Sequence, residues 1–306
     1  MTYAQGGTIE AADFNTFVST GSPNLNSFWS IGSSSEGYGQ TAISTVSVGS
    51  LVEAESWANL INSIASAASH QGTSITSISV PTAASEITYE SALSTNLSTV
   101  YSNILNATAV ATDITSTGTR TADWGTNAGL GEISSTVTVT FPSANQARYF
   151  FNAGGSILIS CSRTGGDGSA ADLSWTTLCD DVATLGLPAS SISQTLASAS
   201  YTGLTKFGGT GTPDIYVRQG FYNLTSTPFT LFRQFSSSGV YTSDYVYVTY
   251  SFSGAVLTIT VNFVDSVTAT VNITGNLSVT AVARPPSDTY ITNTWGTAVV
   301  SVTAPA

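Results

Sequence analysis

Apolar residues recur at helical spacing in the first third of the chain. A spacing of three or four residues puts such side chains on one face of a helix, so we expect helices over about residues 8–18, 50–70 and 85–106. The apolar positions of the two longer helices are Trp57, Leu60, Ile61, Ile64 and Ala68, and then Tyr89, Leu93, Leu97, Val100, Tyr101, Ile104 and Leu105. Residues 1–110 are therefore predicted to be mainly helical.

Local end signals support the helix over 50–70. Ser50 and Glu53 have the spacing of a capping box, in which the two side chains satisfy free backbone N–H groups at a helix start. His70 would lie in the last turn, and Gly72 is the type of residue that commonly follows a helix end. The sequence thus predicts both ends of this helix.

After about residue 121 the apolar spacing changes to two, which predicts strands. Residues 137–141 alternate Val or Phe with Thr, and the same alternation is almost unbroken over 214–303. One inserted helix is expected near 168–185. Adjacent strands joined by tight turns predict an antiparallel meander or sandwich over 111–306, so the expected fold class is α+β.

Turn residues mark where strands should reverse. Asn and Gly readily adopt the positive φ that tight turns require, so the segment 148–161 is interpreted as a hairpin with its turn at Asn152–Gly155. Further turns are expected at 253–254 and at 274–276, the second joining strands over 267–273 and 277–282, and residues 111–121 are interpreted as a connector.

The chain is poor in charge and rich in small hydroxyl groups. Only 8% of its 306 residues are charged, against about 25% in typical soluble domains, whereas 47 are Ser and 47 are Thr. All seven Lys and Arg lie after position 119, and the first 119 residues carry eight acidic ones. Such a surface costs little to desolvate and suits protein–protein contact. We therefore predict a homo-oligomer whose contact residues are Trp57, Leu60, Ile64, Leu93, Leu97 and Tyr101.

Composition also excludes several function classes. A net charge of −11 would repel nucleic acid, whose binders need a basic footprint. No run approaches the ~20 apolar residues of a membrane helix, and the start of the chain lacks the pattern of a secretory signal. Cys161 and Cys179 match no zinc or redox spacing, so no cofactor or metal is expected. Whether they pair stays open, although manufacture in a cytosol disfavours a disulfide.

Candidate catalytic groups are few. His70 is the only histidine, and a place in the last turn of a helix, where a cation complements the helix dipole, favours a structural role over a catalytic triad. Asp180 and Asp181 are the only adjacent acidic pair. Glycosidases need two carboxylates across a cleft, whereas neighbours on a helix point in different directions. No catalytic residue is assigned, and we do not expect an enzyme.

Two features have binding as an alternative interpretation. Gly165-Gly-Asp-Gly168 resembles a fragment of a calcium-binding repeat, but a glycine-rich turn with Asp167 as a helix cap explains a single copy. An incidental hard-cation site stays open, because the chain is rich in oxygen ligands. Four tyrosines could form a carbohydrate or receptor platform, but aromatic residues are also ordinary strand formers and interface residues, so core or subunit contact is favoured. These four are Tyr241, Tyr245, Tyr247 and Tyr250.

The segment Gln146-Ala-Arg-Tyr-Phe-Phe-Asn-Ala-Gly-Gly155 resembles a motif of virion structural proteins from tailed bacteriophages, including marine and cyanobacterial ones, often described as tail-fibre-like. The motif positions are Arg148, Tyr149, Phe150, Phe151, Asn152, Gly154 and Gly155. Other similarities lie at Met1–Phe17, Gly37–Gln40, Gly220–Leu224, Arg284–Ser287 and Thr294–Gly296. The resemblance covers most of the chain, implies a virion component of the tail or neck, and brings no catalytic motif.

We therefore expect a fibre or fibre-attachment subunit that binds copies of itself and other virion proteins, with a host-surface receptor as a further candidate partner. Such a protein is made in the host cytoplasm and released by lysis, which reconciles an extracellular type of surface with the lack of an export signal. The alternatives are a bacterial surface-layer or adhesin subunit and a glycan-binding or glycan-degrading protein of the tailspike type.

Overall fold

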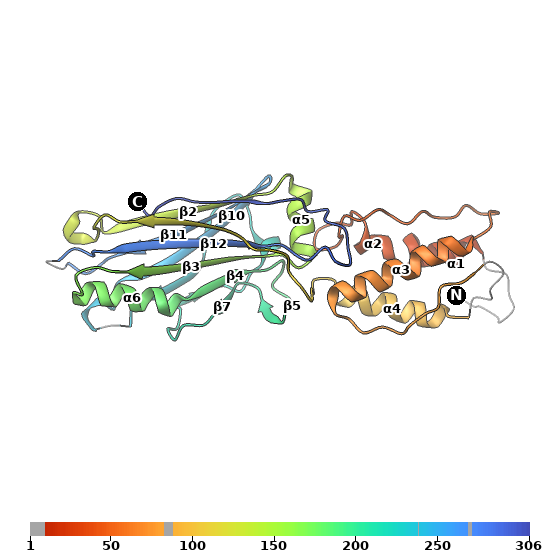
Figure 1. Ribbon diagram of the computed structural model, residues 1–306, viewed down its shortest axis with the longest axis horizontal. Helices are drawn as coiled ribbons and strands as arrows, with labels where there is room; N and C mark the ends of the chain where they lie inside the picture. The colour runs from red at the N-terminus through yellow and green to blue at the C-terminus, as the bar shows by residue number, and fades with distance from the viewer. Residues whose placement is uncertain (1–9, 83–87, 238, 269–270) are drawn as a thin grey trace.

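The computed structural model describes residues 10–82, 88–237, 239–268 and 271–306. Helices α1 to α4 occupy one end of an elongated molecule, and the strands, with helices α5 and α6, occupy the other (Figure 1). The element order changes from helices to strands between Ser102 and Ile114. The chain thus has a mixed α+β fold with a β-rich part, as predicted.

The helical body is defined here as the described residues of 10–110, and these contain two longer helices and three short helical segments. Their bounds are α1 Ala11–Asn15, the π-helix η1 Thr16–Thr20, α2 Leu25–Trp29, α3 Ala54–Gln71 and α4 Glu90–Ser102. Helix α3 ends as predicted, with Gly72 in the left-handed conformation at φ 71°. Its predicted capping box is wrong, because Ser50 closes a turn onto Ser47 and Glu53 is the N-cap without a side-chain cap bond.

Extended segments run beside these helices and are held by asparagine side chains. The Asn15 carboxamide donates to the Val46 carbonyl at 2.8 Å and accepts from the Val46 N–H at 2.9 Å. The same paired bonds, again at 2.8 and 2.9 Å, join Asn26 to Ile43 and Asn96 to Thr76. Each carboxamide offers the donor and acceptor that a neighbouring strand would offer. We call these three pairs the carboxamide clamps.

Two antiparallel sheets build the β-rich part, which is sandwich-like. One sheet has the order β1-β12-β3-β4-β7, the other β13-β2-β11-β10-β9-β8, and β5 pairs with β6 alone. The strands are β1 Ile114–Arg120, β2 Glu132–Thr140, β3 Ser156–Thr164, β4 Thr184–Leu187, β5 Ser193–Leu196, β6 Ala199–Thr202, β7 Thr205–Phe207, β8 Ile215–Tyr216, β9 Phe229–Phe235, β10 Tyr245–Ser253, β11 Val256–Val264, β12 Asn276–Arg284 and β13 Val299–Val302. The helices are α5 Ala144–Asn152 and α6 Ala170–Val182, with 3-10 turns at η2 Thr126–Ala128, η3 Phe221–Asn223 and η4 Gly239–Tyr241.

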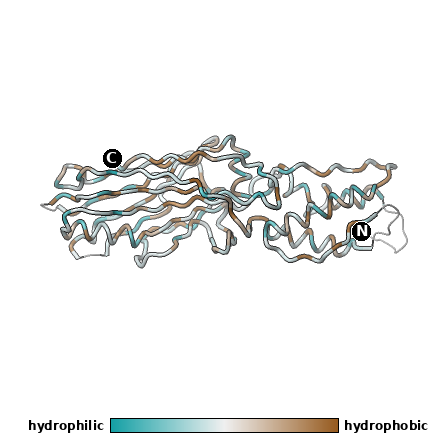
Figure 2. Tube along the Cα trace, in the orientation of Figure 1, coloured by the Kyte–Doolittle hydropathy of each residue, from teal (hydrophilic) through white to brown (hydrophobic). Residues whose placement is uncertain are grey.

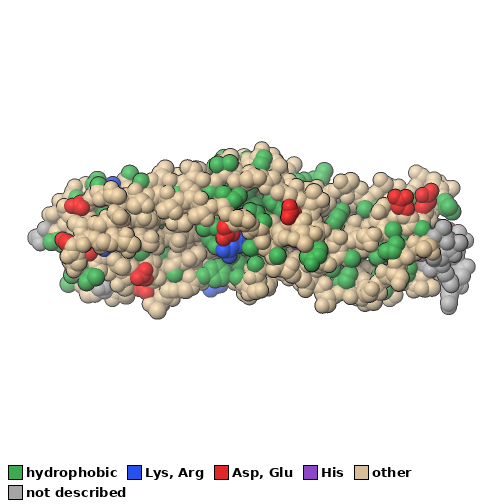
Figure 3. All heavy atoms as spheres, viewed as in Figure 1, with side chains coloured by type: hydrophobic (Ala, Val, Ile, Leu, Met, Phe, Trp, Pro, Cys, Tyr) green, Lys and Arg blue, Asp and Glu red, His purple; other side chains and the backbone are tan. Residues whose placement is uncertain are grey.

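Alternation along the strands separates the core from the surface. In β2, Val137 and Val139 are buried while Thr138 and Thr140 point outward, and hydrophobic and hydrophilic positions alternate along the strands in Figure 2. The outer surface in Figure 3 is mostly neither charged nor hydrophobic. The excess of Ser and Thr in the composition is therefore used in part to cover the outer faces of the sheets.

Some expectations for the β-rich part are confirmed and others are wrong. The inserted helix and the hairpin turn at Ser253–Gly254 are confirmed as α6 and the β10–β11 connection. Residues 111–121 are not a connector, because 114–120 form β1, an edge strand whose threonines point to solvent. The described residues of 267–273 form no strand, and β12 pairs with β1 and β3 instead.

The segment expected to be a hairpin at 148–161 is a helix followed by a strand. The Ser143 hydroxyl accepts a hydrogen bond from the Gln146 N–H at 3.2 Å and starts α5. Aromatic residues favour strands, which explains the wrong prediction, but Ala147, Phe150 and Phe151 have the spacing of one helix face and are buried. A turn after α5 then leads into β3.

The hydrophobic core is continuous from end to end. Phe14 and Trp57 of the helical body belong to the same buried cluster as Val137 and Ile259 of the sheets. The two ends of the molecule are therefore packed together rather than only linked by the chain.

Candidate functional site

Helix α5 lies where the helical body meets the sheets (Figure 1). Its motif residues contact the loop 31–37, the end of α3 and the 3-10 turn η3. We call this region the joint, made of residues 31–40, 70–71, 148–155 and 292–294. Every motif position described below contributes to it.

Arg148 binds the loop of the helical body through backbone carbonyls. Its Nε donates to Ser34 O at 3.2 Å, and its Nη2 donates to Glu36 O at 3.1 Å and Ile31 O at 3.3 Å. A guanidinium carries five N–H donors in a fixed fork, which suits several acceptors at once. The Arg148 side chain therefore holds this loop against α5.

The Asn152 side chain is fully buried and forms hydrogen bonds with two separate parts of the molecule. Its Nδ2 donates to Gly37 O at 3.0 Å, and its Oδ1 accepts from the Tyr222 hydroxyl at 2.6 Å. Burial raises the pKa of Tyr222, so this hydroxyl keeps its proton and donates. Asn152 thus ties the helical body to η3 of the β-rich part.

His70 has a structural role, but it is not the cation at the helix end that its position suggested. At the end of α3, its Nε2 donates to Ala153 O at 2.9 Å, and burial lowers its pKa, so the ring is neutral. Its ring lies 5.6 Å from that of Tyr38, edge to face. The hydrogen bond joins the last turn of α3 to the residue after α5.

The glycines of the motif allow the backbone after α5 to pass close to neighbouring side chains at the joint. Gly154 has φ +91°, and a Cβ there would lie 2.4 Å from the Cβ of Ala107. A Cβ on Gly155 would lie 2.5 Å from a ring carbon of Phe150. Both distances are too short for any side chain, so the chain needs glycine at both positions.

The aromatic motif residues pack the interior of the joint. Phe151 stacks on Phe221, with ring centroids 4.2 Å apart, and Phe150 lies 5.1 Å from Phe141. Tyr149 is buried against Gly39, where a Cβ would lie 2.7 Å from its ring. The whole motif therefore forms a packed junction and leaves no reactive group exposed.

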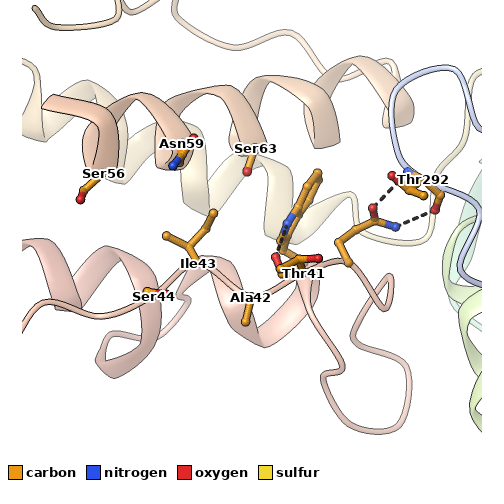
Figure 4. A pocket seen from close by; sticks show the side chains of 10 residues that line it. Thr41, Ala42, Ile43, Ser44, Ser56, Asn59, Ser63 and Thr292 are labelled. Carbon is orange, nitrogen blue, oxygen red and sulfur yellow. Dashed lines mark hydrogen bonds between the residues drawn. The ribbon is translucent and has the colours of Figure 1, made fainter. Parts of the chain in front are cut away.

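A second set of bonds closes the joint from the C-terminal side. Gln40 donates to Thr292 O at 2.8 Å and accepts from Thr292 N at 3.0 Å (Figure 4). The buried Tyr38 hydroxyl donates to Ile104 O at 2.7 Å and accepts from Gln71 at 2.8 Å. Residues more than 250 positions apart thus meet here.

The predicted oligomer contact is wrong for most of its residues. Trp57, Leu60, Ile64, Leu93 and Leu97 are at most 4% exposed and form the interior of the helical body, so they face one another rather than a partner. Tyr101 is half-buried, and its hydroxyl donates to Glu36. Helical spacing marks a buried face, and α3 and α4 bury theirs within one chain.

A groove of about 430 Å³ lies between α3 and the extended segment 40–44. In Figure 4, Ser56, Asn59 and Ser63 of α3 face Ile43 across it. The full lining is Trp29, Gln40, Thr41, Ala42, Ile43, Ser44, Ser56, Asn59, Ser63 and Thr292. Since none of these lining side chains titrates near neutral pH, the groove offers contact surface and hydrogen bonds rather than proton transfer.

The adjacent carboxylates Asp180 and Asp181 do not form a pair for catalysis. Asp180 is exposed, whereas Asp181 is buried and accepts hydrogen bonds from Thr210 at 2.6 Å and Ser237 at 3.3 Å. Their side chains leave α6 in different directions, as expected for neighbours on a helix. Asp181 holds two loops together.

The glycine-rich turn at 165–168 is organised by a buried ion pair that sequence analysis missed. The Asp172 carboxylate contacts Arg163 and accepts from Thr274 N at 2.9 Å and from Asp167 N at 2.9 Å, while both charged side chains are 1% exposed. Burial works to raise the pKa of Asp172, but hydrogen bonds from Thr274 and the Arg163 charge outweigh it and leave that pKa lowered. The cap of α6 is Ser169, whereas the Asp167 side chain accepts from Ser169 N.

Both cysteines are buried free thiols. Cys161 lies on the inner face of β3 as predicted, and Cys179 lies on α6 beside it. A hydrogen bond with Cys161 and burial raise the pKa of the Cys179 thiol, which disfavours the reactive thiolate.

The four tyrosines do not share one environment. Tyr250 is fully buried in the core, and Tyr241 lies half-buried in η4. Tyr245 and Tyr247 point outward from β10, with ring centroids 5.9 Å apart. Tyr245 and Tyr247 therefore present neighbouring rings on the outer face of the sheet.

Comparisons with known proteins gave no match. No protein-family model, curated protein or solved structure matches the chain.

Within the described residues, no three His, Cys, Asp or Glu side chains gather to hold a metal ion. No helix in those same ranges has the length and hydropathy to cross a bilayer. Function must therefore be argued from the geometry of the chain itself.

Proposed function

We propose that this chain is a structural component of a tailed-bacteriophage virion, a tail or neck subunit of the fibre or fibre-attachment kind that acts by self-assembly and docking. The proposal rests on the contacts at the joint. The residues that resemble the phage virion motif are those that fasten the helical body to the sheets, through Arg148, Asn152 and the two glycines. A motif used for rigidity fits a part that bears load between two attachment ends.

The shape and surface support the same function. The molecule is elongated, with helices at one end and sheets at the other (Figure 1). Its surface has few charges, and interfaces with few charges cost less to desolvate. Since the interior of the helical body is used within the chain, the docking contact is formed by outer side chains, which include the exposed Val48 and Leu51.

Immunogold microscopy tests the location. Antibodies against the purified chain should label the tail or neck of particles whose genome encodes it, and peptides of the chain should be found by mass spectrometry of those purified particles. A capsid protein of the same particle is the control for antibody access. Particles that carry neither label nor peptides would show that the chain is not a virion component.

Native mass spectrometry tests self-assembly separately. The full chain at micromolar concentration should give a defined oligomer. The double substitution Val48→Ser with Leu51→Ser should weaken assembly, whereas Leu173→Ser, an exposed apolar residue of α6, is the matched control. A stable monomer at that concentration would contradict the self-assembly part of the proposal.

A further inference from the structure

A small hollow on the outer face of the six-stranded sheet has the chemistry of a ligand site. It encloses about 170 Å³ and is lined by Ile215, Thr230, Arg233, Tyr245 and Tyr247. These residues come from β8, β9 and β10, which are neighbours in the sheet. Pockets for drug-sized ligands measure about 300–1,000 Å³, so this hollow suits one ring of a larger ligand.

Aromatic rings form one side of the hollow. Tyr245 and Tyr247 point outward from β10, and the Phe235 ring lies 5.0 Å from that of Tyr245. The Tyr247 hydroxyl donates to Glu132 at 2.8 Å, which fixes that ring, and burial together with this bond raises the pKa of Tyr247 to about 12. The site thus presents ring surfaces whose positions are set before a ligand arrives.

Arg233, which is ion-paired with the neighbouring Asp214, forms the other side. Arg233 Nε donates to both carboxylate oxygens of Asp214, at 3.2 and 3.0 Å, and both side chains are about one-third exposed. The guanidinium lies 5.1 Å from the Phe235 ring centre and 5.6 Å from that of Tyr245. The ion pair is therefore held beside the rings and remains open to solvent.

Two donors at the hollow have no hydrogen-bond partner within the described chain. Arg233 Nη1 and the Tyr245 hydroxyl make no bond there, while Nε and Nη2 of Arg233 are used by Asp214. The Thr230 hydroxyl of the lining adds an acceptor, and the Asp214 carboxylate lies next to the hollow through its ion pair with Arg233. A ligand with both hydroxyl donors and acceptors would use all of these groups.

The charges around the hollow indicate which class of ligand it binds. Asp214 neutralises Arg233, and Glu132 adds a negative charge, so the hollow is net −1 on a chain of net −11. Anionic ligands are disfavoured by this field, and a purely apolar ligand would leave the Arg233 donor unused. We propose that this hollow binds a neutral pyranose unit of a glycan, with its C–H face on the tyrosine rings and its hydroxyls on Arg233 and Asp214. The site would act in the same way whether or not the chain belongs to a virion.

Saturation-transfer NMR with the full chain tests this site. The probes are the methyl glycosides of glucose, galactose, mannose and N-acetylglucosamine, with glucose 6-phosphate as the anionic probe. At least one neutral glycoside should bind, and glucose 6-phosphate should bind at least tenfold more weakly than it. Absence of binding by all four neutral probes, or tighter binding of the phosphate, would overturn the proposal.

Variants locate the binding on the molecule. Tyr245→Ala and Tyr247→Ala should each weaken the affinity at least tenfold, whereas Tyr290→Ala removes a half-exposed tyrosine elsewhere and should change nothing. Tyr247→Phe keeps the ring and should keep binding. If an alanine variant does not fold by circular dichroism, Arg233→Gln, which keeps both rings, should show the same tenfold loss. Unchanged binding in the folded Tyr245 and Tyr247 variants, or in folded Arg233→Gln, would overturn the assignment.

Discussion

The Asn152 carboxamide and the Gly37 carbonyl, 115 residues apart in the chain, form a buried hydrogen bond of 3.0 Å at the joint. The same side chain accepts from Tyr222, so one residue connects three parts of the molecule. Since a buried polar group that loses its partner costs more than the bond itself contributes, this contact makes the joint sensitive to a single change.

Replacing Asn152 by Leu should destabilise the protein by about 2–4 kcal/mol, because the Gly37 carbonyl and the Tyr222 hydroxyl would each lose a partner. Asn62→Leu, the same change at an exposed position of α3, should cost less than about 0.5 kcal/mol. Urea unfolding of both variants measures the difference. Equal stability of the two variants would show that the joint does not depend on Asn152.

Gly154→Ala should destabilise the protein by more than Gly168→Ala, its matched control. Both glycines have positive φ, at +91° and +77°, but a Cβ would meet Ala107 at 2.4 Å in the first case and open space in the second. We expect the contact with Ala107 to add about 1–3 kcal/mol to the loss of stability, as overpacking commonly does. Adding Ala107→Gly to Gly154→Ala should recover that part in a double-mutant cycle. No recovery would mean that backbone strain alone explains the loss.

Asp172→Asn should cost about 3–5 kcal/mol, because it leaves the Arg163 charge buried without its counter-charge. The matched change Asp214→Asn breaks an ion pair whose side chains are about one-third exposed, and should cost under about 1 kcal/mol. Thermal unfolding at pH 7 compares the two. A similar small loss in both would indicate that the Arg163–Asp172 pair is reached by water.

His70 should make stability fall at acidic pH. Burial lowers its folded pKa below the unfolded value of 6.5, so below about pH 6.5 the unfolded chain binds a proton that the folded chain does not. Stability is therefore full above pH 6.5 and decreases as pH falls from 6.5 toward the folded pKa, by up to about 1.4 kcal/mol per pH unit.

The reference for this pH effect is His70→Gln, whose amide can donate to Ala153 O without titrating. The unfolding free energy of the native protein minus that of the variant should decrease from pH 7 to pH 5, while contributions of the acidic residues cancel. A difference that stays constant over this range would show that His70 is not held neutral.

The sequence predicted those features of the fold that depend only on residues close together in the chain. Gly72 ends α3 because its left-handed conformation is set within one turn, and the hairpin at Gly254 follows from two residues. The joint could not be predicted in this way. Besides the nearby Asn145 side chain, the partners of Arg148 are backbone carbonyls more than 110 residues away. A carbonyl belongs to every residue type, so the sequence does not show which loop Arg148 binds.

The same limit applies to the candidate ligand site. Alternation along the sequence separates Tyr245 and Tyr247 from the buried Tyr250, but only the sheet register shows that β9 lies beside β10. Register also brings Arg233 opposite Tyr247. The phage resemblance marked Arg148 and Asn152 as important without indicating that they form a helix, since aromatic runs occur in both kinds of element.

The carboxamide clamps make the helical body sensitive to hydrolysis of asparagine side chains. Each depends on a nitrogen that donates to a carbonyl, at Asn15, Asn26 and Asn96. Spontaneous hydrolysis of such an amide would turn that donor into a carboxylate oxygen facing another oxygen, and would add negative charge to a part of the chain that has no Lys or Arg to balance it. Each such hydrolysis would release one extended segment from the helix that holds it.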